Sequence, residues 1–131
     1  MDRPAAAMMV PAIQIYRANF RPSASLAQPY LILGINVVAA DTDAEARFLA
    51  TSGRESFASL RRGTPTTLPP PNRAFEKDVV PFGAIPLEET PLVAMVGAAA
   101  TVADGLRRFV AATAPDELNL DCVIVAPPGA K

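Results

Sequence analysis

The most pronounced pattern in the sequence is a nearly unbroken apolar run over residues 30–38, in which several residues are β-branched. Such a run predicts a strand that is buried on both faces, as the strands of parallel sheets are. Directly after it, Asp41, Thr42 and Asp43 supply an N-cap and negative charge for a first helical turn, and apolar residues then recur at helical spacing. We therefore expect a helix over residues 43–61.

The remaining elements are predicted from shorter patterns. Gly53 costs about 1 kcal/mol relative to alanine inside the predicted helix, which indicates a bend or close packing at that point. Mixed apolar and polar residues ahead of Pro22 predict a helix over residues 12–20. Prolines and glycines without a sustained period predict a long, structureless, Pro-rich loop over residues 62–91, typical of a lid or a mobile segment. Downstream we expect a strand over residues 92–97, an amphipathic helix over residues 101–112 and a last strand over residues 117–125.

This order of elements predicts an α/β fold in a single domain over residues 1–131. Strands that alternate with helices form parallel sheets joined by right-handed crossovers. About three strands with flanking helices cannot close a barrel, and a complete (β/α)8 barrel typically needs roughly 250 residues. The outer edges of such a sheet need to be covered by a loop, a helix or another chain.

Composition and charge narrow the functional classes. Half of the residues are hydrophobic and 19% are charged, which favours a packed globular chain. Twelve basic and thirteen acidic residues give a net charge of -1, so neither nucleic acid nor an anionic membrane is an expected partner. The apolar stretch over residues 4–15 is broken by Pro11 and is a poor signal peptide or membrane helix, so we expect a cytoplasmic protein.

The sequence contains no histidine and one cysteine, Cys122. An internal disulfide, a Cys/His metal site and mechanisms with imidazole as the base are therefore excluded, and no metal is expected. Cys122 falls in the predicted last strand, where an inert, buried small hydrophobe is the better interpretation than a nucleophile.

Four stretches together resemble the late barrel of the bacterial-luciferase-like, flavin-dependent monooxygenases. They are residues 15–23; residues 29–46; residues 60–63 with 68–71; and residues 96–106, followed by residues 116–118. The second stretch, a buried strand followed directly by an Ala-Asp-Thr-Asp helix start, is the most specific. The resemblance implies the C-terminal part of a (β/α)8 barrel, FMN as cofactor, and a reaction in which reduced flavin and molecular oxygen oxidise a small organic substrate.

The sequence departs from that family at three points. The family has Gly-Ser/Thr-Pro-Glu before its late helix, whereas Ala98, Ala99 and Ala100 follow Gly97 here. By this resemblance, we expect the chain to lack the closing helix beyond residues 116–118 and the upstream strands that carry most of the family's flavin pocket and catalytic side chains. The resemblance therefore implies an incomplete barrel, and the catalytic residues are unknown.

Gly97, Ala98, Arg61 and Arg62 are the candidate cofactor-binding residues. Gly97 and the amides that begin at Ala98 could form an anion-binding helix N-terminus, and the alternative is an ordinary strand-to-helix turn. Arg61 and Arg62 could contact a flavin phosphate or a nicotinamide cosubstrate, because guanidinium groups bind phosphate bidentately. In the last turn of a helix they could equally satisfy carbonyls and solvent.

Other polar residues leave further alternatives open. Asn36, inside the apolar run, points into a barrel lumen or pairs with a buried neighbour. Asp41 and Asp43 have the spacing of a carboxylate pair, but helix capping accounts for them better. Four residues could line a substrate mouth, although surface packing is the favoured interpretation: Tyr16, Arg17, Arg21 and Tyr30.

Two functional hypotheses follow. The first is an incomplete luciferase-like monooxygenase or oxidoreductase relative that lacks most of the flavin pocket and is not active by itself. The second is a non-catalytic structural or interaction module that dimerises through its exposed sheet edges. The expected partners are a second copy of the chain or a chain that supplies the missing half of the barrel.

Overall fold

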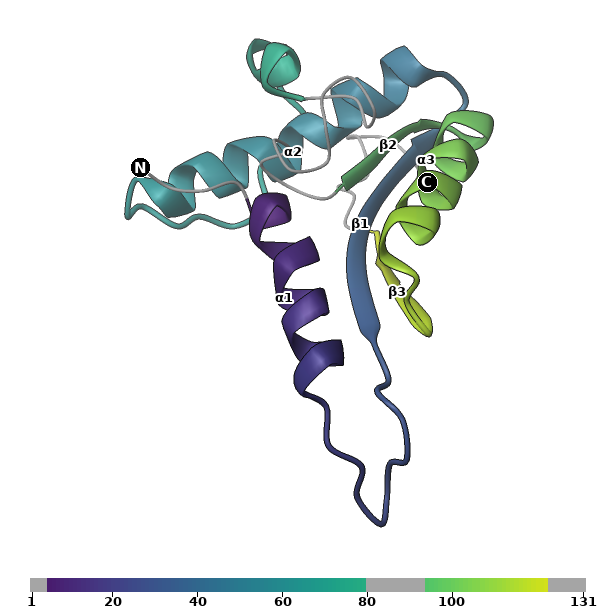
Figure 1. The fold of residues 1–131 in the computed structure, drawn as a ribbon. Helices are drawn as coiled ribbons and strands as arrows, with labels where there is room; N and C mark the ends of the chain where they lie inside the picture. The colour runs from purple at the N-terminus through teal and green to yellow at the C-terminus, as the bar shows by residue number, and fades with distance from the viewer. Residues whose placement is uncertain (1–4, 80–93, 123–131) are drawn as a thin grey trace.

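The computed structural model describes residues 5–79 and 94–122, which form a parallel sheet flanked by helices (Figure 1). The elements in chain order are α1 (Ala5–Asn19), β1 (Ile32–Ala40), α2 (Asp43–Arg61), the 3-10 helix η1 (Arg73–Asp78), β2 (Ala94–Ala98), α3 (Ala99–Thr113) and β3 (Glu117–Asp121). The predicted α/β class with an open, three-stranded parallel sheet is confirmed. Figure 1 shows the long helix α2 leaving from the carboxyl end of β1, with α1 and α3 on either side of that strand.

The strand order is β2-β1-β3, so the first strand of the chain is the central one. Its second half pairs with β2 and its first half with β3, both in parallel. Asn36 is the position that the two ladders share, because it is opposite Ala94 in β2 and opposite Asp121 in β3. If each strand paired with the next one in the chain, β1 would lie at an edge of the sheet. The hydrophobic pattern of the sequence therefore did not predict the observed order.

One face of the sheet carries the core. Ile35 and Val37 of β1 and Met95 of β2 pack against Val102 and Phe109 of α3. The prediction that β1 is buried on both faces is wrong, because buried and exposed positions alternate along it, and Ile32 is 55% exposed. Helix α3 and Met9 of α1 cover the core face, whereas α2 covers only part of the second face.

Helix α2 matches the predicted range, and its N-cap follows the expected chemistry. The Thr42 hydroxyl accepts a hydrogen bond from the Glu45 amide at 3.1 Å. Gly53 does not provide close packing, since a Cβ atom added there would meet nothing within 4 Å. Helix α1 ends where Pro22 predicts, but it begins at Ala5 and includes Pro11, seven residues earlier than expected.

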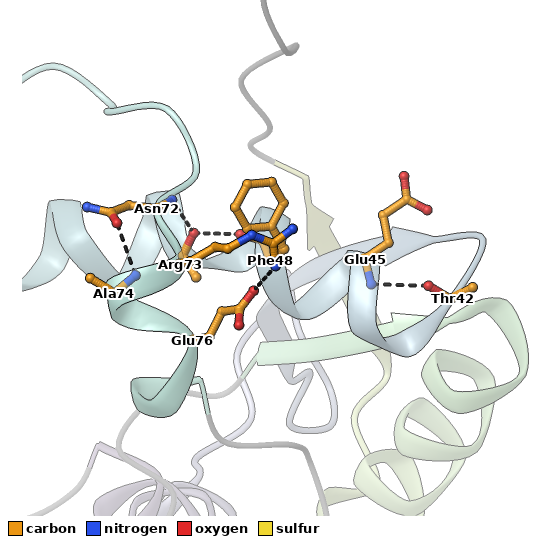
Figure 2. A network of polar contacts seen from close by, with 8 residues as sticks. Thr42, Glu45, Phe48, Asn72, Arg73, Ala74 and Glu76 are labelled. Carbon is orange, nitrogen blue, oxygen red and sulfur yellow. Dashed lines mark hydrogen bonds and ion pairs between the residues drawn. The ribbon is translucent and has the colours of Figure 1, made fainter.

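The segment after α2 is not a structureless loop throughout, as the sequence suggested. Residues 73–78 form η1, whose first turn is capped by the Asn72 side chain through a 3.0 Å bond from the Ala74 amide. Figure 2 shows this cap beside the Arg73 guanidinium, which lies over the Phe48 ring of α2 at 4.6 Å from its centroid. Contacts with α2 therefore order a turn that hydrophobic periodicity does not reveal, and residues 80–91 of the predicted loop lie outside the described residues.

The last three elements are close to their predicted positions. Strand β2 begins at Ala94, with residues 92 and 93 outside the described part, and α3 extends the predicted helix at both ends. Helix α3 stops at Ala114, which adopts the left-handed conformation with φ 45°. Strand β3 is described to Asp121, and residues 123–125 of the predicted strand lie beyond the described range.

Candidate functional site

A cavity of about 350 Å³ lies between α2 and the face of the sheet opposite the core. Asn36, Ala94 and Asp121 form one row across the three strands, so their side chains project from the same face. The wall is mainly apolar, and we call this site the α2 cavity. Its lining residues are Asn36, Val37, Val38, Leu49, Ala50, Gly53, Arg54, Ser56, Phe57, Leu60, Leu68, Ala94 and Asp121.

The topology places this cavity where the chain changes direction across the sheet. From β1 the chain crosses to β2 on one side through α2, and it later crosses to β3 on the other side through α3. Right-handed crossovers to opposite sides put the two helices on opposite faces, which agrees with α3 on the core and α2 over the cavity. In open α/β sheets, ligands bind at such reversals outside the carboxyl ends of the strands. This cavity instead lies over the middle of β1, the first residue of β2 and the later part of α2.

Arg54 supplies an unusual polar group in the wall of the α2 cavity. Its Nε atom is buried and has no hydrogen-bond partner, although nine-tenths or more of buried polar groups in proteins are paired. Its guanidinium carbon is 6.0 Å from the centroid of the Phe57 ring, which also lines the cavity. The site therefore combines an apolar wall with one positively charged side chain, whose Nε atom is closed to solvent.

Asn36 is an exposed residue that faces the α2 cavity, so its side chain is not a buried amide held by a neighbour. Sequence reasoning singled out Asn36 but missed Arg54, Phe57 and Asp121. Asp121 comes into the site only through the register with Asn36, which no local pattern contains. Arg54 and Gly53 both line the cavity, but consecutive residues of a helix do not share a face, so no local pattern identified Arg54.

Gly97 and Ala98 lie at the junction of β2 and α3. There the Asp43 carboxylate accepts a hydrogen bond from the first free amide of the helix start. The Ala98 amide donates to Oδ1 of Asp43 at 2.7 Å. This bond, followed by one from Thr101, holds the pKa of Asp43 below its ordinary value. A Cβ atom at Gly97 would lie 2.6 Å from Cγ2 of Thr101, so this glycine is required for close packing. Asp43 thus links α2 to α3. The N-terminus of α3 therefore binds a carboxylate of the same chain, as an ordinary strand-to-helix turn can.

Arg61 and Arg62 lie at the other end of α2 from that junction. With about 1.5 Å of rise per residue, the 19 residues of α2 span about 28 Å. Arg61 lies 6.0 Å from the Phe57 ring centroid, and the Arg62 guanidinium donates to the Ser59 hydroxyl at 3.2 Å. The structure therefore does not bring the four candidate cofactor-binding residues together around one anion.

The aromatic and basic residues near the N-terminus hold elements together. The Tyr16 hydroxyl accepts from the Tyr30 amide at 3.2 Å, and Arg17 donates to the Thr113 carbonyl at 3.1 Å. The Tyr30 hydroxyl donates to Glu117 at 3.1 Å, and this bond raises the pKa of Tyr30. These contacts fasten α1 and the start of β1 to the end of α3 and to β3.

Three further observations concern the cysteine, metal binding and membrane helices. Cys122 is exposed, so the prediction that it is buried is wrong, because β3 is an edge strand that little else covers. Among residues 5–79 and 94–122, no three His, Cys, Asp or Glu side chains gather as a metal-binding group. In the same part of the chain, no helix has the length and apolar character to cross a membrane.

A second hollow of about 380 Å³ lies on the outer side of α2, between Phe48 and the proline segment at residues 69–71. It is more open to solvent than the α2 cavity. Its basic residue, Arg73, is already paired with Glu76 at 3.0 Å. The α2 cavity is therefore the better candidate for binding a small molecule.

Comparisons with known proteins agree with this architecture. No protein-family model matches the chain. The chain is similar to a luciferase-like monooxygenase of Escherichia coli strain K12, with 37% identity over 114 residues that cover 87% of this chain and 34% of the relative. An uncharacterized protein of Bacillus subtilis strain 168, YvbT, is 38% identical over 112 residues, 86% of this chain and 33% of that protein. The crystal structure of apo-MsnO8 superposes with a TM-score of 0.71 and 30% identity, over 90% of this chain and 36% of the other.

Proposed function

Because this chain is a C-terminal part of the luciferase-like monooxygenase family and spans about a third of the length of its relatives, we propose that it forms one wall of a flavin-dependent monooxygenase barrel. In this family, reduced flavin supplies the electrons with which molecular oxygen oxidises a small organic substrate. The activity of a whole enzyme would then need the strands that the other two thirds of such a protein provide.

The observation that carries this proposal is the open second face of the sheet. Ile32 is 55% exposed, Gly34 and Asn36 are also exposed, and α2 covers this face only over the later part of β1. In a (β/α)8 barrel the inner strand face packs against the other strands. Here α2 covers the later part of the second face, and the exposed start of β1 at Ile32 and Gly34 is the part left open for the strands of a missing half.

The described residues do not fit the phosphate of a flavin. Ala98 has already given its amide to Asp43, and that carboxylate would repel a phosphate at the start of α3. Arg61 and Arg62 are at the far end of α2 from this point. We therefore assign no step of the flavin reaction to these residues, and we expect FMN to bind only when the rest of a barrel is present.

A chimera tests this proposal. The matched third of the Escherichia coli relative would be replaced by this chain, and FMN binding would be followed by the visible absorbance that co-elutes on gel filtration. We expect the chimera to retain FMN as the unmodified relative does, and the chain alone to elute without it. A folded chimera that loses FMN while the relative keeps it would contradict the proposal.

The second candidate, an interaction module that dimerises through its sheet edges, is favoured by β3. All its residues except Leu118 are exposed, Leu120 is 48% exposed, and within the described residues no strand pairs with the outer edge of β3. Sedimentation of the purified chain tests this candidate. A dimer that dissociates in Leu120→Lys but not in Val110→Lys, an exposed change on α3, would favour it, and a monomer would exclude it.

A further inference from the structure

The outer edge of β3 offers a place on the sheet for one more strand. Within the described residues, β3 pairs with β1 on one side and with no strand on the other. Four of its five residues are exposed, and Leu120 is 48% exposed. We propose that this edge binds an extended segment of a partner chain in which basic and apolar residues alternate. The inference rests on the proposal that the chain forms one wall of a barrel, and it names the strand that would continue that wall.

The backbone groups of Leu118 and Leu120 point toward this open edge. The Glu117 amide donates to the Leu31 carbonyl of β1 at 3.1 Å, so the backbone groups of Glu117 point toward β1. Because successive residues of a strand alternate in direction, those of Asn119 also point toward β1, and those of the two leucines point away from it. Free N–H and C=O groups along a strand edge are a template for pairing with a strand of another chain.

The side chains of β3 give its two faces different chemistry. Leu118 and Leu120 project from the core face, where Leu118 packs against the hydrophobic cluster. The alternate residues project from the second face, and they are Glu117, Asn119 and Asp121. A strand added at this edge would therefore lie beside two leucines on one face and beside two carboxylates on the other.

Both carboxylates lack a basic partner. The Glu117 carboxylate accepts a hydrogen bond from the neutral Tyr30 hydroxyl at 3.1 Å. Asp121 lines the α2 cavity together with Arg54, but no ion pair joins the two within the described part of the chain. Opposite charges directly across two strands attract each other, and like charges repel. Lysine or arginine beside this row would therefore favour pairing.

The same charges make a second copy of the chain a poorer occupant of this edge. If two β3 strands paired in antiparallel fashion about Asn119, Glu117 of each copy would lie opposite Asp121 of the other. The leucines would meet on one face, but the two carboxylates of each copy would gather on the other face. Charge complementarity therefore favours a partner strand whose residues beside the carboxylates are basic and whose alternate residues are apolar.

The experiment titrates the full chain with two peptides of about seven residues, in which valine alternates with lysine or with glutamate. Binding is followed by the backbone amide signals in nitrogen-15 NMR spectra. We expect the lysine peptide to bind about tenfold more tightly, because two cross-strand pairs change from repulsion to attraction, and salt should weaken this preference. The amides of Leu118 and Leu120 should exchange more slowly in the complex, whereas that of Asn119 should change little.

Two double variants test the role of the charges. Glu117→Gln combined with Asp121→Asn keeps the shape of the row and should remove the preference for the lysine peptide. Glu117→Lys combined with Asp121→Lys should reverse it, so that the glutamate peptide binds about tenfold more tightly. Val110→Lys, which adds a positive charge at an exposed position on α3, is the control and should leave the preference unchanged.

Equal affinities of the unmodified chain for the two peptides would overturn this inference. So would an absence of binding, amide shifts that lie away from β3, or a dimer of the unmodified chain that forms through β3 without either peptide. The chimera described above separates this inference from the proposed function. A chimera that retains FMN, together with a chain that binds neither peptide, would contradict the partner strand alone.

Discussion

Ala114 is the residue at which the backbone of α3 is under the clearest local strain. Its φ of 45° lies in the left-handed region, where a residue with a Cβ atom costs roughly 1–2 kcal/mol. Glycine has no such cost, but it loses more backbone entropy on folding. We therefore expect Ala114→Gly to stabilise the chain by about 0.5–1 kcal/mol.

Urea denaturation measures this gain as a higher midpoint with an unchanged slope. The matched control is Ala111→Gly, an exposed position within the right-handed part of α3. That substitution should destabilise the chain by about 1 kcal/mol. Equal losses at positions 111 and 114 would show that the left-handed turn is not a source of strain.

Gly97 shows the opposite requirement, since here a side chain has no room. A Cβ atom would lie 2.6 Å from Cγ2 of Thr101 and 2.8 Å from Oδ1 of Asp43. Gly97→Ala should therefore destabilise the chain by about 1–3 kcal/mol, measured by urea denaturation. Gly34→Ala is the control, because a Cβ atom in that part of β1 meets nothing within 4 Å. A Gly97→Ala variant as stable as Gly34→Ala would contradict the packing described at this junction.

Among the elements, η1 is held on α2 by a buried hydroxyl in addition to the contact of Arg73 with the Phe48 ring. Thr51 is fully buried, accepts a hydrogen bond from the Asn72 amide at 2.8 Å and donates to the Phe48 carbonyl. Thr51→Val keeps the shape but leaves the Asn72 amide without its acceptor, which should cost about 1–3 kcal/mol.

Thr51→Ser is the matched control for this prediction, because it retains the hydroxyl and loses only a methyl group, at about 0.8 kcal/mol. Amide hydrogen exchange adds a local measurement. The amides at Asn72 and Ala74 should exchange faster in Thr51→Val and not in Thr51→Ser. Unchanged protection in the valine variant would mean that other contacts hold η1 on α2.

The junction of α2 with α3 should respond to pH through Asp43. The Ala98 amide and Thr101 lower the pKa of Asp43 from its ordinary value of 3.8 in the folded chain. The ionised form therefore stabilises the fold above the unfolded-state pKa, and this contribution is lost as the pH falls through the lower folded-state pKa. Asp43→Asn, which keeps an acceptor oxygen, should lower the melting temperature at neutral pH.

The difference in melting temperature between the unmodified chain and Asp43→Asn should shrink as the pH falls from about 6 to about 2. Asp41→Asn, two residues earlier and also exposed, is the control and should behave as the unmodified chain does. A difference that stays constant across this range would show that the charge of Asp43 does not contribute.

For the molecule as a whole, the sequence predicted the elements that depend on interactions between residues close together in the chain. The strand at β1 and the helix at α2 follow from an apolar run and from the N-cap at Thr42, which lie within a few residues of each other. The parallel α/β class followed from their alternation. These features could be predicted because each depends on residues that are neighbours in the sequence.

The parts that could not be predicted depend on partners far apart in the chain. Asp43 was expected to cap its own helix, yet it binds the amide of Ala98, 55 residues away. The α2 cavity needs Asn36 and Asp121 in one row, which depends on the strand order and not on either segment alone. For the same reason the exposure of Cys122 was missed, because an edge strand and a central strand have similar sequences.

The central position of β1 also has a consequence for how the chain acquires its structure. Both neighbours of β1 follow it in the sequence, and the contact that begins its pairing with β3, between the Leu31 amide and Asp116, closes a separation of 85 residues. During synthesis, β1 therefore leaves the ribosome before either of its partner strands, and its pairing with β3 waits until Asp116 has been made. Long-range closure of this kind is slow and exposes strand edges to aggregation, so the translation interval between β1 and β3 is when the nascent chain most needs a chaperone.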